Sequence, residues 1–231
     1  MKRSIRTMFA AVLAITVISL FSTVKISAQP GIIGEVLRRM ENHYKTLSTL
    51  KASVKMDLYT SQIEDHESRE GSLIFIPQKG RDAAFRIDWT KPSSESLSVV
   101  NKQYVMYQAN LKQATTGSVN GVRAPGGSSI LSILNMSKVE LKANFDINYV
   151  GLENVTGGTS TWHLQLIPKT AIGYKSADIW VDADGMPVQL KQVQKNNDST
   201  TVLLYALNKN SKIDARDVQV SVPKGTKVIK S

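Results

Sequence analysis

The chain has 231 residues, 42% of them hydrophobic, and contains no cysteine. This composition excludes wholesale disorder, disulfides, thiolate catalysis, cysteine-based zinc sites and a lipidated N-terminal cysteine. The formal net charge is +10, but the first 28 residues hold four basic residues and no acid, so the rest of the chain is only mildly basic. A charge this diffuse does not indicate nucleic acid binding.

Residues 1–28 have the layout of a secretory signal peptide: a basic start, an apolar run over 8–24, and the small residue Ala28 at the cut. An uncleaved anchor is the alternative, because a run of this length lies at the lower edge for a membrane span. We expect cleavage, and a mature domain over 29–231. An exported protein without cysteine fits a bacterial periplasm better than a disulfide-dependent extracellular setting.

The mature chain is predicted to begin with one amphipathic helix and to continue mainly as strands. Apolar residues recur at helical spacing over Gly31–Leu47. Alternating or short apolar runs then predict strands, with a charged connection over 61–70 and turn residues between the others. The strands of this first half are Ala52–Thr60, Ser72–Ile76, Ala83–Thr90, Leu97–Val100, Tyr104–Gln108 and Leu111–Thr115.

The middle of the chain changes character. Thr116–Ser129 is rich in Gly, Ser and Asn and is predicted to be a mobile loop. A very short apolar helix over Ile130–Asn135 follows, and then a capping box from Ser137 to Glu140 starts a helix that ends near residue 144. A helix as short as Ile130–Asn135 is marginal alone, so it must dock on another part of the protein.

Strands resume in the second half, at Asp146–Leu152 and Trp162–Pro168, followed by a three-stranded meander over 177–207. A last short strand is predicted at Asp217–Val222, with Pro223–Thr226 closing the domain. The sequence therefore predicts a mainly β protein. About ten strands in a single antiparallel sheet must curl, and something must fill the apolar concave face.

No motif indicates catalysis. A nucleophile elbow, a P-loop and a dinucleotide fingerprint are all absent, and the three histidines are scattered. His66 lies among acidic residues without metal-ligand spacing, and Asp182-x-Asp184-Gly185 resembles only part of a calcium loop. We read both as hairpin turns. The sequence therefore predicts no catalytic residue, no metal site and no cofactor, and the protein is not expected to be an enzyme.

The short helix after a Gly-rich loop favours a lid over an apolar cavity, because a flexible hinge suits a static core poorly. Apolar residues two apart along a strand lie on one face of the sheet and would form the walls of the cavity. Apolar residues of the short helix would form the lid. The other reading is that all of these residues are only core. The predicted ligand-binding residues are Met56, Leu58, Phe85, Ile87, Trp89, Ile130, Leu131 and Leu134.

Two stretches, Ala84–Gln113 and Lys212–Ile229, resemble the periplasmic outer-membrane lipoprotein carrier family (LolA-like). The matching points are Phe85-Arg86, Lys91-Pro92, Tyr107 and Val222-Pro-Lys-Gly225. The resemblance implies an incompletely closed (half) β-barrel with a helical lid that binds the acyl chains of lipoproteins. It also implies two partners: an inner-membrane transporter that supplies acylated lipoproteins and an outer-membrane receptor that accepts them.

The sequence departs from the family pattern at two places. Well-known carriers have an Arg after the second strand that holds the lid shut, but here that place falls near Pro77-Gln78, and Arg81 is out of register. Asn101-Lys102 replaces the usual Asp-Gly turn between the middle strands. We therefore expect apolar contact alone to hold this lid. The lack of a lipobox cysteine favours a soluble, monomeric shuttle over the membrane-anchored receptor relative.

Two other functions stay open from the sequence. The first is a sensor or other lipid-binding protein of the same fold, whose cavity binds lipid as a signal and does not transport it. The second is an exported hydrolase whose site has no recognisable motif. Co-purified lipid or acylated protein would separate the two lipid-binding readings from the hydrolase.

Overall fold

The computed structural model describes residues 29–78, 83–119 and 125–231, so the expected signal peptide and Arg81 lie outside the described residues. None of the helices in these ranges is long and apolar enough to cross a membrane. The helical elements are α1 (Gln29–Thr46), α2 (Lys138–Asn144) and the 3-10 helices η1 (Ala109–Leu111) and η2 (Pro125–Asn135). The strands are β1 (Leu50–Thr60), β2 (Asp65–Ile76), β3 (Ala84–Lys91), β4 (Glu95–Val100), β5 (Gln103–Gln108), β6 (Gln113–Ser118), β7 (Phe145–Asn154), β8 (Ser160–Pro168), β9 (Tyr174–Val181), β10 (Pro187–Gln194), β11 (Ser199–Lys209) and β12 (Lys227–Lys230).

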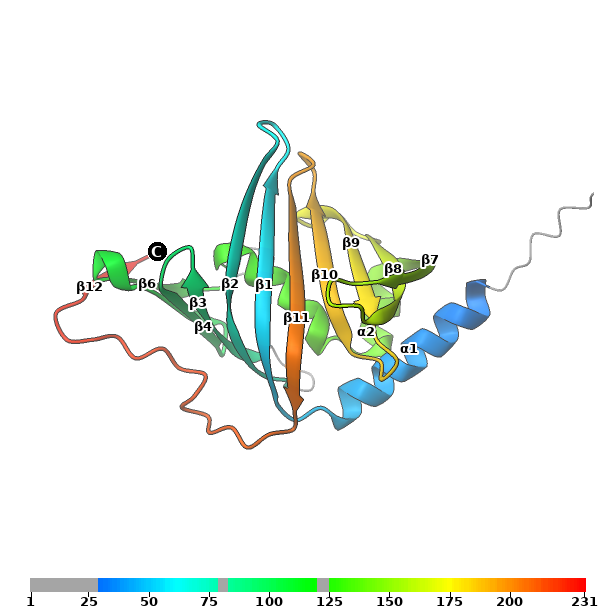
Figure 1. Cartoon of the computed structure of the whole chain (residues 1–231), viewed down its shortest axis with the longest axis horizontal. Helices are drawn as coiled ribbons and strands as arrows, with labels where there is room; N and C mark the ends of the chain where they lie inside the picture. The colour runs from blue at the N-terminus through cyan, green and yellow to red at the C-terminus, as the bar shows by residue number, and fades with distance from the viewer. Residues whose placement is uncertain (1–28, 79–82, 120–124) are drawn as a thin grey trace, which may run out of the picture.

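All twelve strands belong to one open sheet in the order β12-β6-β5-β4-β3-β2-β1-β11-β10-β9-β8-β7. The pairing of β1 with β11 joins the two halves of the chain at the centre of the sheet, and β12 and β7 are its two edges. Every pair is antiparallel except β12 with β6. The sheet curls without closing, and the helices lie on one side of it (Figure 1). The predicted fold class is therefore confirmed, with more strands than expected.

The predicted N-terminal helix is confirmed as α1. Its apolar stripe is buried, with Val36 and Leu37 fully inaccessible. Its polar side carries Glu35, which accepts hydrogen bonds from Arg38 and Arg39. Helix α1 contacts β7 and α2, so it closes the end of the molecule beside one sheet edge.

The charged connection predicted over 61–70 is wrong for most of its length. Only 61–64 form the turn, and β2 already begins at Asp65, opposite Thr60 of β1. The Nδ1 atom of His66 lies 2.9 Å from a carboxylate oxygen of Asp57 on this hairpin. The alternation of apolar and polar residues is missing because both faces of β2 are polar at this end, so the strand gave no sequence signal.

The C-terminal prediction is also wrong. Asp217–Val222 forms turns and bends, with Val218 buried, and the final strand is β12, which pairs with β6 from Lys227 onwards. All four residues of β12 are exposed, so this strand has no buried face to produce alternation. The segment between β11 and β12 runs from the middle of the sheet past one half of it to reach the edge at β12 (Figure 1).

The turn between β9 and β10 places the sheet against α1. The side chain of Asp182 accepts hydrogen bonds from the backbone N–H groups of Asp184 and Met186. Gly185 has a φ of +88°, and a Cβ there would lie 2.3 Å from the backbone carbonyl of Arg39. The close approach of helix and turn therefore depends on the missing side chain.

We predict that Gly185→Ala destabilises the protein through both backbone strain and this clash. Gly157→Ala is the matched control, because Gly157 also has a positive φ, +98°, but has nothing within 4 Å of a Cβ. Overpacking typically costs about 1–3 kcal/mol, so the unfolding free energy of Gly185→Ala should be lower than that of Gly157→Ala by about this amount. Urea unfolding measures the difference, and equal losses would contradict tight docking of α1.

Candidate functional site

The concave face of the sheet carries a continuous apolar surface built by strand alternation. On β3, Phe85, Ile87 and Trp89 are 7%, 0% and 3% exposed. Their cross-strand partners on β2 are Phe75, Leu73 and Gly71, in the same order. The three β3 residues therefore share one buried face of the sheet, as their period-two spacing predicts. Whether they bind a ligand stays a prediction. Met56 of β1 extends the same surface and is fully buried.

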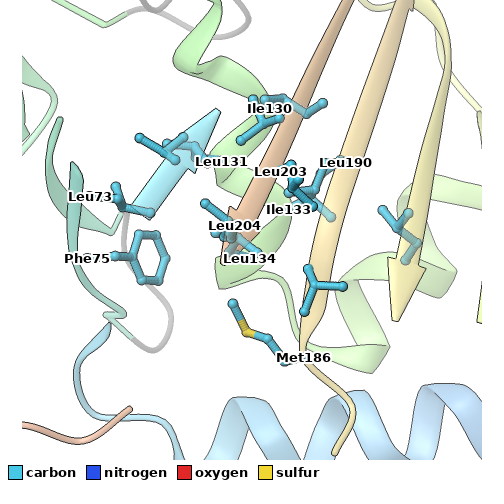
Figure 2. Close-up of a cluster of buried hydrophobic side chains, with 14 of the residues drawn as sticks. Leu73, Phe75, Ile130, Leu131, Ile133, Leu134, Met186, Leu190, Leu203 and Leu204 are labelled. Carbon is cyan, nitrogen blue, oxygen red and sulfur yellow. The ribbon is translucent and has the colours of Figure 1, made fainter. Parts of the chain in front are cut away.

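Helix η2 covers this face from the inside of the curl. It contacts β10 and β11, and its four apolar side chains are between 1% and 8% exposed. Figure 2 shows them between Leu73 and Phe75 on one side and Leu190 of β10 on the other. The docking that a marginal helix requires is therefore present. The four side chains are Ile130, Leu131, Ile133 and Leu134.

The structure gathers the predicted site residues in one place. Seven of them belong to a single buried hydrophobic cluster, and Leu58 is partly buried and packs against it. In this arrangement the lid side chains themselves occupy the concave face. A ligand on that face would have to displace η2. The seven residues are Met56, Phe85, Ile87, Trp89, Ile130, Leu131 and Leu134.

A pair of hydrogen bonds holds the end of η2, contrary to the expectation of apolar contact alone. The side chain of Asn135 accepts a hydrogen bond from the backbone N–H of Gln78 at 3.0 Å and donates one to the Gln78 carbonyl at 3.2 Å. Gln78 lies two residues beyond β2, where the family resemblance implies a latching Arg. The connection at this place is therefore made by a side chain of η2 to backbone groups beyond β2. The sequence signal for it was a single Asn at the end of an apolar run.

Helix α1 holds the chain directly after the lid. The carboxylate of Glu41 accepts a hydrogen bond of 2.9 Å from the backbone N–H of Lys138, at the start of α2. This bond lowers the pKa of Glu41. The predicted capping box is also confirmed, since Ser137 and Glu140 exchange hydrogen bonds. Helix α2 is thus fixed at its first turn, so any movement of η2 would pivot before Ser137.

The loop before the lid is shorter than predicted. Residues 116–118 belong to β6 and pair with β5, and η2 already begins at Pro125. Residues 120–124 lie outside the described residues. The end of β6 was predicted as loop because its Gly and Ser residues do not form the apolar and polar alternation of a half-buried strand.

The convex face is polar, as the alternation on β3 predicts. Arg86 makes an ion pair of 2.9 Å with Asp88 and donates a hydrogen bond to the backbone carbonyl of Gln219. Ser96 donates a hydrogen bond to the same carboxylate. Arg86, which is held by Asp88, therefore ties the C-terminal segment to the outside of the sheet, away from η2.

The histidines lie apart from the concave cluster. His163 on the convex side lies 2.9 Å from carboxylate oxygens of both Glu153 and Asp178 and stacks on Trp180. Burial lowers the pKa of His43 on α1. Within the described ranges, no three His, Asp or Glu side chains converge on a position that could hold a metal ion.

The geometry of an open curled sheet with a helical cover has a counterpart among known families. The family model "Outer membrane lipoprotein carrier protein LolA" matches residues 46–219. The chain belongs to this family. The match runs from the last residue of α1 to the segment after β11 and so includes strands β1–β11 and helix η2. No curated protein matches the sequence of the chain.

Solved structures resemble the chain at low sequence identity. An uncharacterized conserved protein from Thermus thermophilus is 15% identical, with a TM-score of 0.54, and the alignment covers 87% of this chain and 99% of that one. The lipoprotein LppX from Mycobacterium tuberculosis is 12% identical, with a TM-score of 0.47 and coverage of 80% and 99%. MucB of Pseudomonas aeruginosa, in its complex with MucA, is 12% identical, with a TM-score of 0.45 and coverage of 81% and 60%.

We predict that Asn135→Ala loosens the lid without unfolding the sheet. Each hydrogen bond contributes about 0.5–1.5 kcal/mol, so losing both should raise amide exchange in η2 by roughly tenfold or more. Hydrogen exchange followed by mass spectrometry measures this, with the β9–β11 meander as the internal reference. Ser132→Ala is the control, because Ser132 is exposed on the same helix. Unchanged exchange in η2 would contradict a latching role.

Proposed function

We propose that the protein is an exported, non-enzymatic carrier that binds lipoprotein acyl chains on the concave face of its sheet. It takes acylated lipoproteins from an inner-membrane transporter and delivers them to an outer-membrane receptor. Met56, Leu58, Phe85, Ile87 and Trp89 form the sheet wall of the site. Ile130, Leu131 and Leu134 cover it when it is empty and move aside when acyl chains enter.

The observation that carries this proposal is the nature of the cover. The apolar concave face is covered by a 3-10 helix of 11 residues, η2, whose C-terminal end is held by the side chain of Asn135. A 3-10 helix has poorer hydrogen-bond geometry than an α-helix, so one of this length depends on docking for its stability. Such a cover can be exchanged for another apolar group of similar shape. Membership of the lipoprotein carrier family supports acyl chains as that group.

Binding would rest on apolar burial. Removing roughly 200 Å² of acyl surface from water contributes about 5 kcal/mol at about 25 cal/mol per Å², before ordering costs. Because the lid already covers the concave face, the net binding free energy is only the difference between the free energy of burying the acyl chain and that of burying the lid. This competition keeps the affinity moderate, so a more apolar receptor site can take the chain without any chemical step.

Trp89 offers a direct test of where acyl chains bind. It lies on the concave face at 3% exposure, whereas Trp180 lies on the other face, where its indole donates a hydrogen bond to Glu153. A lipopeptide with bromine atoms on its acyl chains should quench Trp fluorescence on contact. We predict that Trp89→Phe loses the larger part of the quenching and that Trp180→Phe keeps it.

Both substitutions exchange one aromatic ring for another, so the fold should be retained, and urea unfolding checks this. Equal quenching in the two variants would place the acyl chains elsewhere. Mass spectrometry of material that co-purifies from the periplasm tests the carrier function itself. Acylated protein or lipid should be found, and its consistent absence would contradict the proposal.

A further inference from the structure

At one end of the concave face, the apolar side chains of the sheet wall give way to polar ones on the same face. Arg69 of β2 lies directly opposite Met56 of β1, so both side chains lie on the same face of the sheet. Glu95 of β4 lies opposite Trp89 in the same way, and Gln108 of β5 lies opposite Glu95. These three polar residues occupy the end nearest the β1–β2 turn. The lid latch at Gln78 is at the opposite end of β2.

The polar residues are joined into a network that is mostly shielded from water. Arg69 donates to Glu67 at 2.7 Å and lies 3.5 Å from a carboxylate oxygen of Glu95. Gln108 donates to the other oxygen of Glu95 at 3.1 Å. The side chains of Arg69 and Glu95 are only 22% and 11% exposed. Burying charges beside Trp89 and Met56 is costly, and an apolar pair would pack there at less cost.

The network leaves hydrogen-bonding capacity on the guanidinium of Arg69. A guanidinium carries several N–H donors in a fixed fork, and among the described residues only the Nε–H finds a hydrogen bond of normal length. The contact with Glu95, at 3.5 Å, is an ion pair without that geometry. Arg69 itself lies beside Met56, at the end of the apolar wall. Its remaining donors are suited to an acceptor oxygen of a molecule whose hydrocarbon part lies on that wall.

The charge around Arg69 restricts which acceptor fits. Two carboxylates, Glu67 and Glu95, contact one guanidinium, so the cluster has a formal net charge of −1. A ligand carboxylate or phosphate would therefore meet repulsion from like charges. A neutral carbonyl oxygen would not, and it accepts a hydrogen bond from a charged donor strongly.

We propose that Arg69, positioned by Glu95 and Gln108, is the headgroup subsite of the acyl site and binds the ester or amide carbonyls of a neutral acylated head. This rests on the proposed function. The acyl chains then run from Arg69 past Trp89 towards the latched end of η2. The subsite makes the protein selective for esterified or amide-linked chains over free fatty acids and over hydrocarbons without a head.

The test compares a synthetic diacylated lipopeptide, a free fatty acid of equal chain length and a headless hydrophobic dye. Arg69→Met should weaken lipopeptide binding about tenfold or more, as expected for one lost hydrogen bond to a charged group, and should leave dye binding unchanged. The double variant Arg69→Met/Glu95→Gln should show the same loss of lipopeptide binding. It leaves no unpaired buried carboxylate at position 95, so it provides the test if the single variant folds poorly. Lys55→Met, on the exposed face of β1, is the control.

The outcomes separate this inference from the proposed function. Wild-type protein that binds none of the three probes contradicts the carrier proposal as a whole. Lipopeptide binding that is equal in the wild type and in both Arg69 variants overturns the headgroup subsite alone. Fatty acid binding as tight as lipopeptide binding in the wild type also overturns it, because the net negative cluster should reject the carboxylate.

Discussion

The constraint on which this structure depends is the apolar inner face of a sheet that curls without closing. The strands of this sheet, apart from the exposed β12, present inward side chains that no second sheet covers within the described ranges. Burial of such a face from water is the main source of stability for a protein of this kind. Helix η2 meets the constraint with four side chains, and α1, which packs against β7 and α2, adds its apolar stripe to the same buried cluster. The rest of the fold positions these two covers.

The two covers differ in how firmly they are held. Helix α1 packs so closely on the β9–β10 turn that Gly185 has no room for a side chain, and Glu41 reaches on to the start of α2. Helix η2 is held by its apolar side chains and by the latch of Asn135 at its C-terminal end. A stable frame with one weakly latched element is the arrangement expected of a lid, since mobile elements come from the least stable parts of a structure.

The parts of the fold that have one buried face were predictable from the sequence. The stripe of α1, the alternation on β1 and β3, and the meander all follow from periods that burial imposes. The polar start of β2 and the exposed strand β12 were not predicted, because no buried face constrains their sequences. The burial of the strand and η2 residues on the concave face was likewise predictable, whereas the Asn135–Gln78 hydrogen bonds and the Arg69–Glu95 pair depend on contacts between distant segments. Single polar residues carry no periodic signal of such contacts.

Fixing the lid tests the central claim most directly. The chain has no cysteine, so Gln78→Cys/Asn135→Cys places two unique thiols where the latch now joins η2 to the end of β2. A short thiol cross-linker should then block loading of acylated lipopeptide, and a cleavable version should restore loading when it is reduced. Single-cysteine variants treated in the same way should load normally. If the cross-linked double variant loads at the normal rate, η2 is a permanent part of the core and the account is wrong.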